Sequence, residues 1–177
     1  MKKFLNLILN GVGAVLAIVA LFLGFAPVAA SITTTSSGSS VTLTEDNSNS
    51  LFGMFTDDNG SKYVGVGVVI IIFLVIAILA IGLLIAAEFL KKSCKWEWII
   101  NIGVCVLMVI AGILYFAIPE ITKEVTTLGS NTVTAKINLA GGPIVAGIFS
   151  LLGGLAVGFN GVKHFIFKKL LRNRSEF

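Results

Sequence analysis

The sequence offers few residues that could do chemistry. Its one histidine, His164, follows Lys163 and has no carboxylate or thiol pair nearby, so it forms neither a catalytic triad nor a metal site. The glycines of Gly65-Val66-Gly67 open an apolar run and follow no predicted strand, unlike those of a phosphate-binding loop. We therefore expect no catalytic, cofactor-binding or metal-binding residue, and a protein that is not an enzyme.

The most acidic segment is Asp57-Asp58-Asn59-Gly60. A calcium loop needs several oxygen ligands at alternate positions and a closing glutamate, and only Asp57, Asn59 and Ser61 fit that spacing. Asn-Gly is typical of a tight turn. The pattern favours a turn over a cation site.

Four long apolar runs are the dominant feature of the chain. Charged residues make up 12% of its 177 residues, against about 25% in soluble domains. About 20 helical residues cross a hydrocarbon core of about 30 Å. The runs are apolar on every face, whereas strands of a membrane barrel alternate. The sequence predicts an all-α membrane protein, a single four-transmembrane-helix bundle with spans at 4–26, 64–87, 98–118 and 143–161.

The first apolar run has a second interpretation. Lys2 and Lys3 precede it and Val28-Ala29-Ala30 is an acceptable cleavage site, so residues 1–30 resemble a secretory signal peptide. The apolar part of such a peptide is about 7–15 residues long, which is shorter than the run at 4–26. We expect an uncleaved helix.

The basic residues indicate an orientation. With the N-terminus inside, ten of the thirteen Lys and Arg residues fall in inner segments, and only Lys62, Lys123 and Lys136 fall in outer loops. By the positive-inside rule both termini are predicted to be cytoplasmic. The positive charge therefore needs no nucleic acid as a partner. Short loops, and no cysteine in the outer loops, favour a bacterial plasma membrane.

The two outer loops, 27–63 and 119–142, carry similar patterns. β-branched segments at 32–35 and 41–44 flank a Ser-Gly-Ser-Ser turn, and those at 124–128 and 132–137 flank Gly-Ser-Asn. A lone hairpin is marginal, so we predict that both join in a small extracellular antiparallel β-sheet. The inner loop, 88–97, is too short for a catalytic domain.

Prolines are expected to set helix ends. Pro27 and Pro119 are predicted to stop the first and third helices, and Pro143 to open the fourth.

Helix four carries small residues at every fourth position. Such a ridge lets helix backbones approach closely, either within the bundle or against a second copy or partner. The ridge residues are Gly142, Ala146, Ser150, Gly154 and Gly158, and a weaker stripe in helix one is Gly13, Ala17, Ala20 and Gly24. The main polar residues in the spans are Asn6, Asn10, Asn101, Ser150 and Asn160. They fit interhelical hydrogen bonds better than a substrate path.

Two further segments could contact partners. An apolar group in the first outer loop fits a partner-binding knob or a plug packed on the helix ends: Leu51, Phe52, Met54 and Phe55. The basic tail, 162–177, is predicted to continue helix four and meet anionic lipid at the membrane surface through Lys163, Lys168, Lys169, Arg172 and Arg174.

This layout resembles that of tetraspan proteins such as claudins, whose outer loops also form a small sheet. The resemblance is topological, because 27–63 contains neither the tryptophan nor the two cysteines of the claudin motif. The sequence favours a non-enzymatic membrane scaffold or accessory subunit that binds another membrane protein or itself. The alternatives are a small oligomeric, holin-like pore and a transporter subunit.

Overall fold

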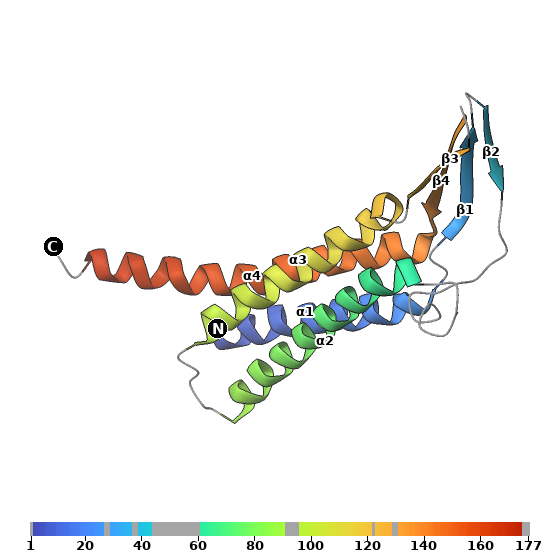
Figure 1. Ribbon diagram of the computed structural model, residues 1–177. Coiled ribbons are helices and arrows are strands. Elements are labelled where there is room, and N and C mark those ends of the chain that lie inside the picture. Colours follow the sequence, from blue (N-terminus) through green and yellow to red (C-terminus); the bar gives the residue numbers. More distant parts are fainter. Residues whose placement is uncertain are drawn as a thin grey trace.

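The computed structural model places four long helices side by side with a small sheet at one end (Figure 1). It describes residues 2–26, 29–36, 39–43, 61–90, 96–121, 123–128 and 131–174. The helices are α1 (Lys2–Phe22, continued by the 3-10 turn η1, Leu23–Phe25), α2 (Ser61–Phe89), α3 (Glu97–Ile121) and α4 (Gly141–Arg174). All four are long and apolar enough to cross a membrane, as predicted.

The helices form a ring in which each packs against two neighbours. The contact between α3 and α4 is the most extensive, and α4 also packs along α1. α2 closes the ring between α1 and α3. Among the four helices, α4 therefore has the most extensive contacts with its neighbours.

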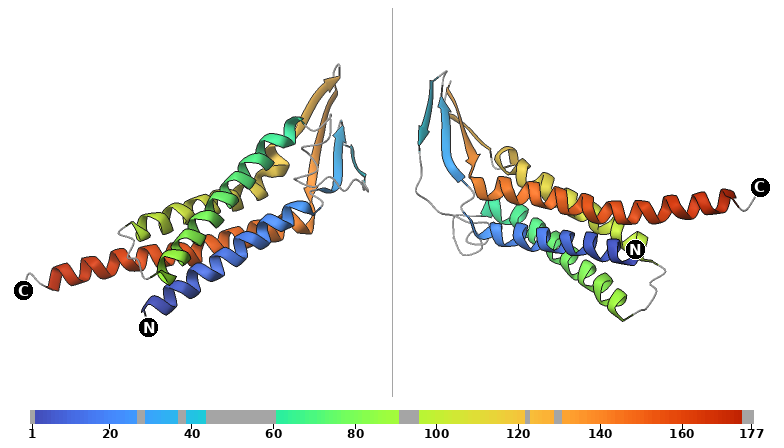
Figure 2. Two further views of the ribbon diagram at one scale, coloured as in Figure 1. Left: turned by 90° about the horizontal axis from the view of Figure 1, so that it is seen from below. Right: turned by 180° about the vertical axis from the view of Figure 1, so that it is seen from behind.

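α4 is much longer than the span predicted for it. Its 34 residues extend about 51 Å, against a hydrocarbon core of about 30 Å. The C-terminal part continues past the end of the bundle, beside the N-terminus of α1 (Figure 2). The prediction that the basic tail continues the helix is confirmed through Arg174.

Prolines act only partly as predicted. Pro143 is the third residue of α4, where a backbone N–H has no acceptor within the helix. The prediction that Pro119 stops the third helix is wrong, because Pro119 lies inside α3, which runs to Ile121. So close to the end of a helix, a proline removes one hydrogen bond and leaves no long segment to displace. Pro27 lies outside the described residues.

The sheet has four antiparallel strands in the order β2-β1-β4-β3. They are β1 (Ala29–Ser36), β2 (Ser39–Leu43), β3 (Glu124–Leu128) and β4 (Asn131–Leu139). The segments 27–63 and 119–142 each supply one hairpin. β1 pairs with β4 across the two hairpins, so that Thr34 lies opposite Val41 on one side and Ala135 on the other. The prediction that both loops join in one sheet is confirmed.

One face of this sheet carries most of its hydroxyl groups, beside Val125 and Lys136. Alternation along each strand places the side chains of Thr33, Thr35, Ser40, Thr42, Thr127, Thr132 and Thr134 on the same side. The hydroxyls of Thr33 and Thr42 lie 3.3 Å apart, and Asn138 Nδ2 donates to Thr33 Oγ1 at 2.9 Å. We call this surface the hydroxyl face.

The central strands connect closely to the helices. Only Ala140 separates β4 from α4, and β1 follows shortly after η1. Lys136 on β4 also forms a salt bridge with Glu120 on α3. The sheet is thus mounted on the ends of three helices.

A pair of cysteines would test the β1–β4 pairing. With Cys94 and Cys105 removed, Thr34→Cys with Ala135→Cys should form a disulfide on oxidation, because these residues are directly opposed. Thr34→Cys with Thr134→Cys is the control, because those side chains point to opposite faces. A mobility shift on a non-reducing gel measures both. Equal crosslinking of the two pairs would contradict this register.

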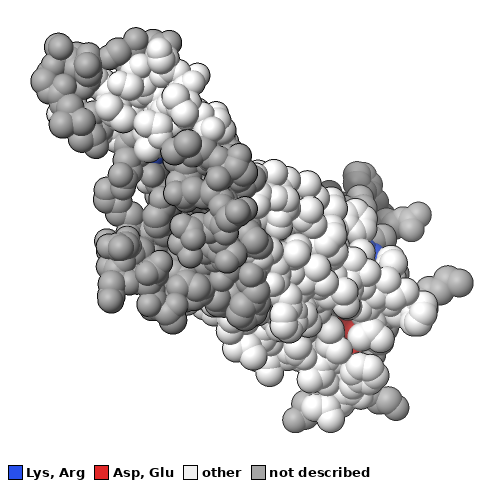
Figure 3. Space-filling model, turned by 90° about the vertical axis from the view of Figure 1, so that its right-hand side faces the viewer, with Lys and Arg blue, Asp and Glu red and all other residues white. Residues whose placement is uncertain are grey.

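The core consists of two apolar layers. The layer near the sheet contains Ala20, Ile70, Leu74, Ala111, Tyr115, Ile118 and Ala146. The layer further from the sheet contains Ala17, Ala77, Ile81, Val104, Met108 and Val157. The outer surface is also apolar: Leu83 is 72% exposed and Phe22 66%. Figure 3 shows few charged atoms among the described residues on the face it presents. Such a surface suits lipid rather than water.

Candidate functional site

Glycines of α4 form a close seam with α3. A Cβ added to Gly154 would lie 3.1 Å from Met108 Cβ and 3.2 Å from the carbonyl oxygen of Cys105. At Gly158 it would lie 2.5 Å from Cys105 Sγ, and at Gly161 3.1 Å from the carbonyl oxygen of Trp98. Backbone carbonyls of α3 thus lie close to α4 at Gly154 and Gly161, and the Cys105 side chain lies close to Gly158. Small residues permit such a close approach of two helices.

A second seam joins α4 to α1. A Cβ on Gly13 would clash with Val157 Cγ2. One on Gly153 would lie 3.1 Å from Leu16 Cβ of α1, and also 2.6 Å from Met108 Cε of α3. Near the sheet, a Cβ on Gly142 would lie 2.5 Å from Ala26 Cβ. Of the small-residue stripe of helix one, Gly13 lies in this seam, and Ala17 and Ala20 are fully buried in the core.

The predicted ridge of α4 is divided between these two seams. Gly142 contacts the end of α1, whereas Gly154 and Gly158 contact α3. Ala146 and Ser150 are fully buried between them. A spacing of four residues advances by about 40° per step on a helix of 3.6 residues per turn, so the ridge winds from one neighbour to the other. Of the two roles considered for the ridge, this packing corresponds to the one within the bundle rather than the one against a second copy or partner.

Three further glycines of α4 lie in the seams and were not predicted: Gly147, Gly153 and Gly161. A signal for two of them was present, because Gly147, Gly154 and Gly161 recur every seven residues. A seven-residue period keeps side chains on one face of a helix that packs at a shallow angle. It marks the face toward α3 better than the four-residue spacing does.

A polar layer lies at the end of the bundle away from the sheet. Asn160 Nδ2 donates to Asn10 Oδ1 at 3.2 Å, which links α4 to α1. One turn further out, Lys163 Nζ donates to Asn6 Oδ1 at 3.5 Å. Asn101 on α3 is 1% exposed and flanks Gly161. The predicted interhelical role of asparagines is thus present at Asn6, Asn10 and Asn160.

Tyr115 makes an interhelical contact that the sequence did not predict. It is 1% exposed, and its hydroxyl donates to the carbonyl oxygen of Ala20 at 3.1 Å. Ala20 belongs to the last four residues of α1, whose carbonyls lack the regular donor four residues on. Tyr115 therefore caps α1 from α3.

Several predicted contact residues cannot be placed. Leu51, Phe52, Met54 and Phe55 lie outside the described residues, as do the side chains of Lys168, Lys169, Arg172 and Arg174. Lys163 is described and partly buried. No group of three His, Cys, Asp or Glu residues within the described ranges could hold a metal ion.

A double-mutant cycle would measure the asparagine pair. Asn10→Ala and Asn160→Ala should each destabilise the bundle, and the double variant should lose less than their sum, by about 0.6–1.7 kcal/mol. The double variant loses less stability than the sum of the two single variants, because each single change leaves the other amide unpaired in an apolar bundle. Unfolding in mixed detergent measures all four proteins. Strict additivity would contradict a direct bond.

Four apolar helices with an apolar outer surface define the class: this is a multi-pass membrane protein of four candidate spans. No protein-family model matches the chain, and no curated protein sequence or solved structure is significantly similar to it.

Proposed function

We propose that this chain works by binding, as a membrane scaffold or accessory subunit for another membrane protein or for copies of itself. The proposal rests on one observation, the attachment of the sheet to the ends of three helices. Its central strands continue from α1 and into α4, and the salt bridge between Lys136 and Glu120 adds a link to α3. The sheet is therefore held in a defined orientation at the end of the bundle.

The hydroxyl face supports a role in contact. Thr35, Ser40, Thr42, Thr127 and Thr132 are exposed there, and they contribute nothing to the apolar layers of the bundle. Hydroxyl groups donate and accept hydrogen bonds, so such a surface suits a polar protein partner.

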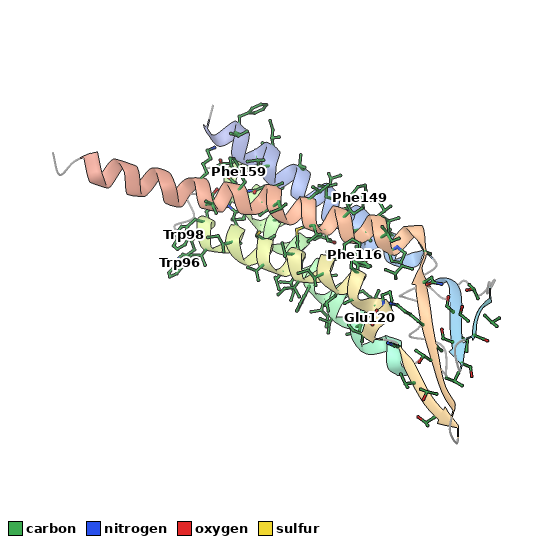
Figure 4. The ribbon with its side chains drawn as sticks, turned by 90° about the horizontal axis from the view of Figure 1, so that it is seen from above. Trp96, Trp98, Phe116, Glu120, Phe149 and Phe159 are labelled. Carbon is green, nitrogen blue, oxygen red and sulfur yellow. The ribbon has the colours of Figure 1, made fainter. Side chains whose placement is uncertain are left out.

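The proposed orientation places the sheet outside the cell and both termini in the cytoplasm. The N-terminus and the C-terminal part of α4 lie at the same end, opposite the sheet (Figure 2). Trp96 and Trp98 also lie at that end, at the start of α3 (Figure 4). The two tryptophans support a membrane boundary at this end, and the excess of Lys and Arg in these segments supports placing that boundary on the cytoplasmic side.

Site-specific photocrosslinking in native membranes tests the proposal. A crosslinking amino acid at exposed Thr35 should give a discrete protein adduct, whereas one at Leu83, which is 72% exposed on α2, should label lipid. Mass spectrometry then identifies the adduct.

The outcomes separate the functional classes. A stoichiometric different protein would make this chain an accessory subunit. A self-adduct would favour a homo-oligomer, and conductance in liposomes would then test the pore alternative. Labelling of lipid alone from both positions would contradict the binding role.

A further inference from the structure

The polar layer contains three asparagines from three helices at one level of the bundle. Asn10 is 0% exposed, Asn101 1% and Asn160 3%. Asn160 bonds to Asn10, while Gly161, the next residue, would place a Cβ 3.2 Å from Asn101 Cβ. Asn10 and Asn101 therefore flank the same turn of α4.

Two polar atoms of this layer have no partner among the described residues. They are Nδ2 of Asn10, a donor, and Oδ1 of Asn101, an acceptor. Ser150 Oγ is a third such atom, but a serine hydroxyl can turn to the carbonyl four residues back in its own helix. Unlike Ser150, Asn10 and Asn101 flank one turn of α4.

The chemistry of these two atoms selects a neutral ligand. A cation would not bind an amide donor, and an anion would not bind a carbonyl acceptor. Water accepts from one group and donates to another, and buried water makes about three such bonds in proteins. The hydrocarbon chains of lipid neither accept nor donate hydrogen bonds.

We propose that the asparagine layer holds ordered water, which enters the bundle at the end marked by Lys163. That residue is partly buried and bonds to Asn6, one turn outward from Asn10, so polar groups line the way in. Toward the sheet the layer ends at Ala17, Met108 and Val157, which are all 0% exposed. The water therefore occupies a blind pocket rather than a pore.

Cysteine accessibility tests this pocket in proteoliposomes. In a protein lacking Cys94 and Cys105, Asn10→Cys and Asn101→Cys should react with a small, membrane-impermeant methanethiosulfonate reagent. Ala17→Cys and Val104→Cys, which replace buried residues of the apolar layer, are matched controls. We expect the asparagine positions to react at least about tenfold faster than these controls, because water reaches only the former.

Each outcome bears on the proposal. Asparagine positions as unreactive as Ala17→Cys would overturn it, and so would rapid reaction at Ala17→Cys, since that requires a continuous path. NMR of the unmodified protein guards against misfolded variants. The side-chain amide protons of Asn10 and Asn101 are expected to exchange with water without strong protection, and protection lasting hours would refute the entry of water.

Discussion

Replacing Gly158 with alanine should destabilise the folded protein by about 1–3 kcal/mol, although alanine is the better helix former. The added methyl group would lie 2.5 Å from Cys105 Sγ and 3.0 Å from Cys105 Cβ. The thiol can rotate away, but the Cβ is fixed to the backbone of α3. The two helices must therefore separate, and the contacts along the whole seam weaken.

The double substitution Gly154→Leu with Gly158→Leu should be far more damaging. Even a single added carbon at either position would have a neighbour within 3.1 Å, and a leucine side chain is much larger. We therefore expect the free energy of unfolding to fall by about 3 kcal/mol or more. That is a large share of the stability of a typical small domain, about 5–15 kcal/mol. Thermal unfolding in detergent, with the yield of monodisperse protein, measures the effect.

Gly103 on α3 provides the matched control. A Cβ there would have nothing within 4 Å, so Gly103→Ala should stabilise the helix by up to about 1 kcal/mol. Gly103→Ala should raise the free energy of unfolding and Gly158→Ala should lower it. Opposite signs of the two changes would separate the effect of packing from that of helix propensity. If Gly158→Ala were neutral or stabilising, the seam would not be as close as the structure shows.

The same double substitution separates the two roles of the ridge. If Gly154 and Gly158 pack within the chain, the leucine variant should lose its fold. If they join copies of the chain, the variant should remain folded and lose only its assembly. Light scattering beside the unfolding measurement distinguishes the two results.

Replacing Tyr115 with alanine should cost about 3–5 kcal/mol, because it empties a fully enclosed aromatic site. Tyr115 is 1% exposed and belongs to the core layer formed by all four helices near the sheet. Its Cβ also lies beside Gly147, where an added Cβ would be 3.2 Å from Tyr115 Cβ. Ile113→Ala, at a residue 55% exposed on the same helix, should cost much less.

Tyr115→Phe separates the hydroxyl from the ring. It removes the bond to the carbonyl oxygen of Ala20 and keeps the apolar contacts. We expect a loss of about 1 kcal/mol, the usual value for one hydrogen bond. Unfolding in mixed detergent compares the three variants, and equal stability of Tyr115→Phe and the parent would show that the cap contributes nothing.

The sequence alone determined the number of long apolar helices and the approximate ends of their apolar parts, because apolar length is a property of consecutive residues. It also predicted both hairpins, since β-branched segments around short turns are local patterns. The joining of the hairpins followed from the instability of either one alone. Pro119 was misjudged because the cost of a proline depends on how much helix follows it.

The tertiary structure decided which side of each helix faces inward. In a soluble protein the apolar face marks the core, but in lipid every face is apolar, and α2 illustrates this by being apolar all round. What selects the inner face is close van der Waals contact and hydrogen bonding between residues far apart in the chain. Asn10 and Asn160, 150 positions apart, and Tyr115 and Ala20, 95 positions apart, become partners only when the helices pack.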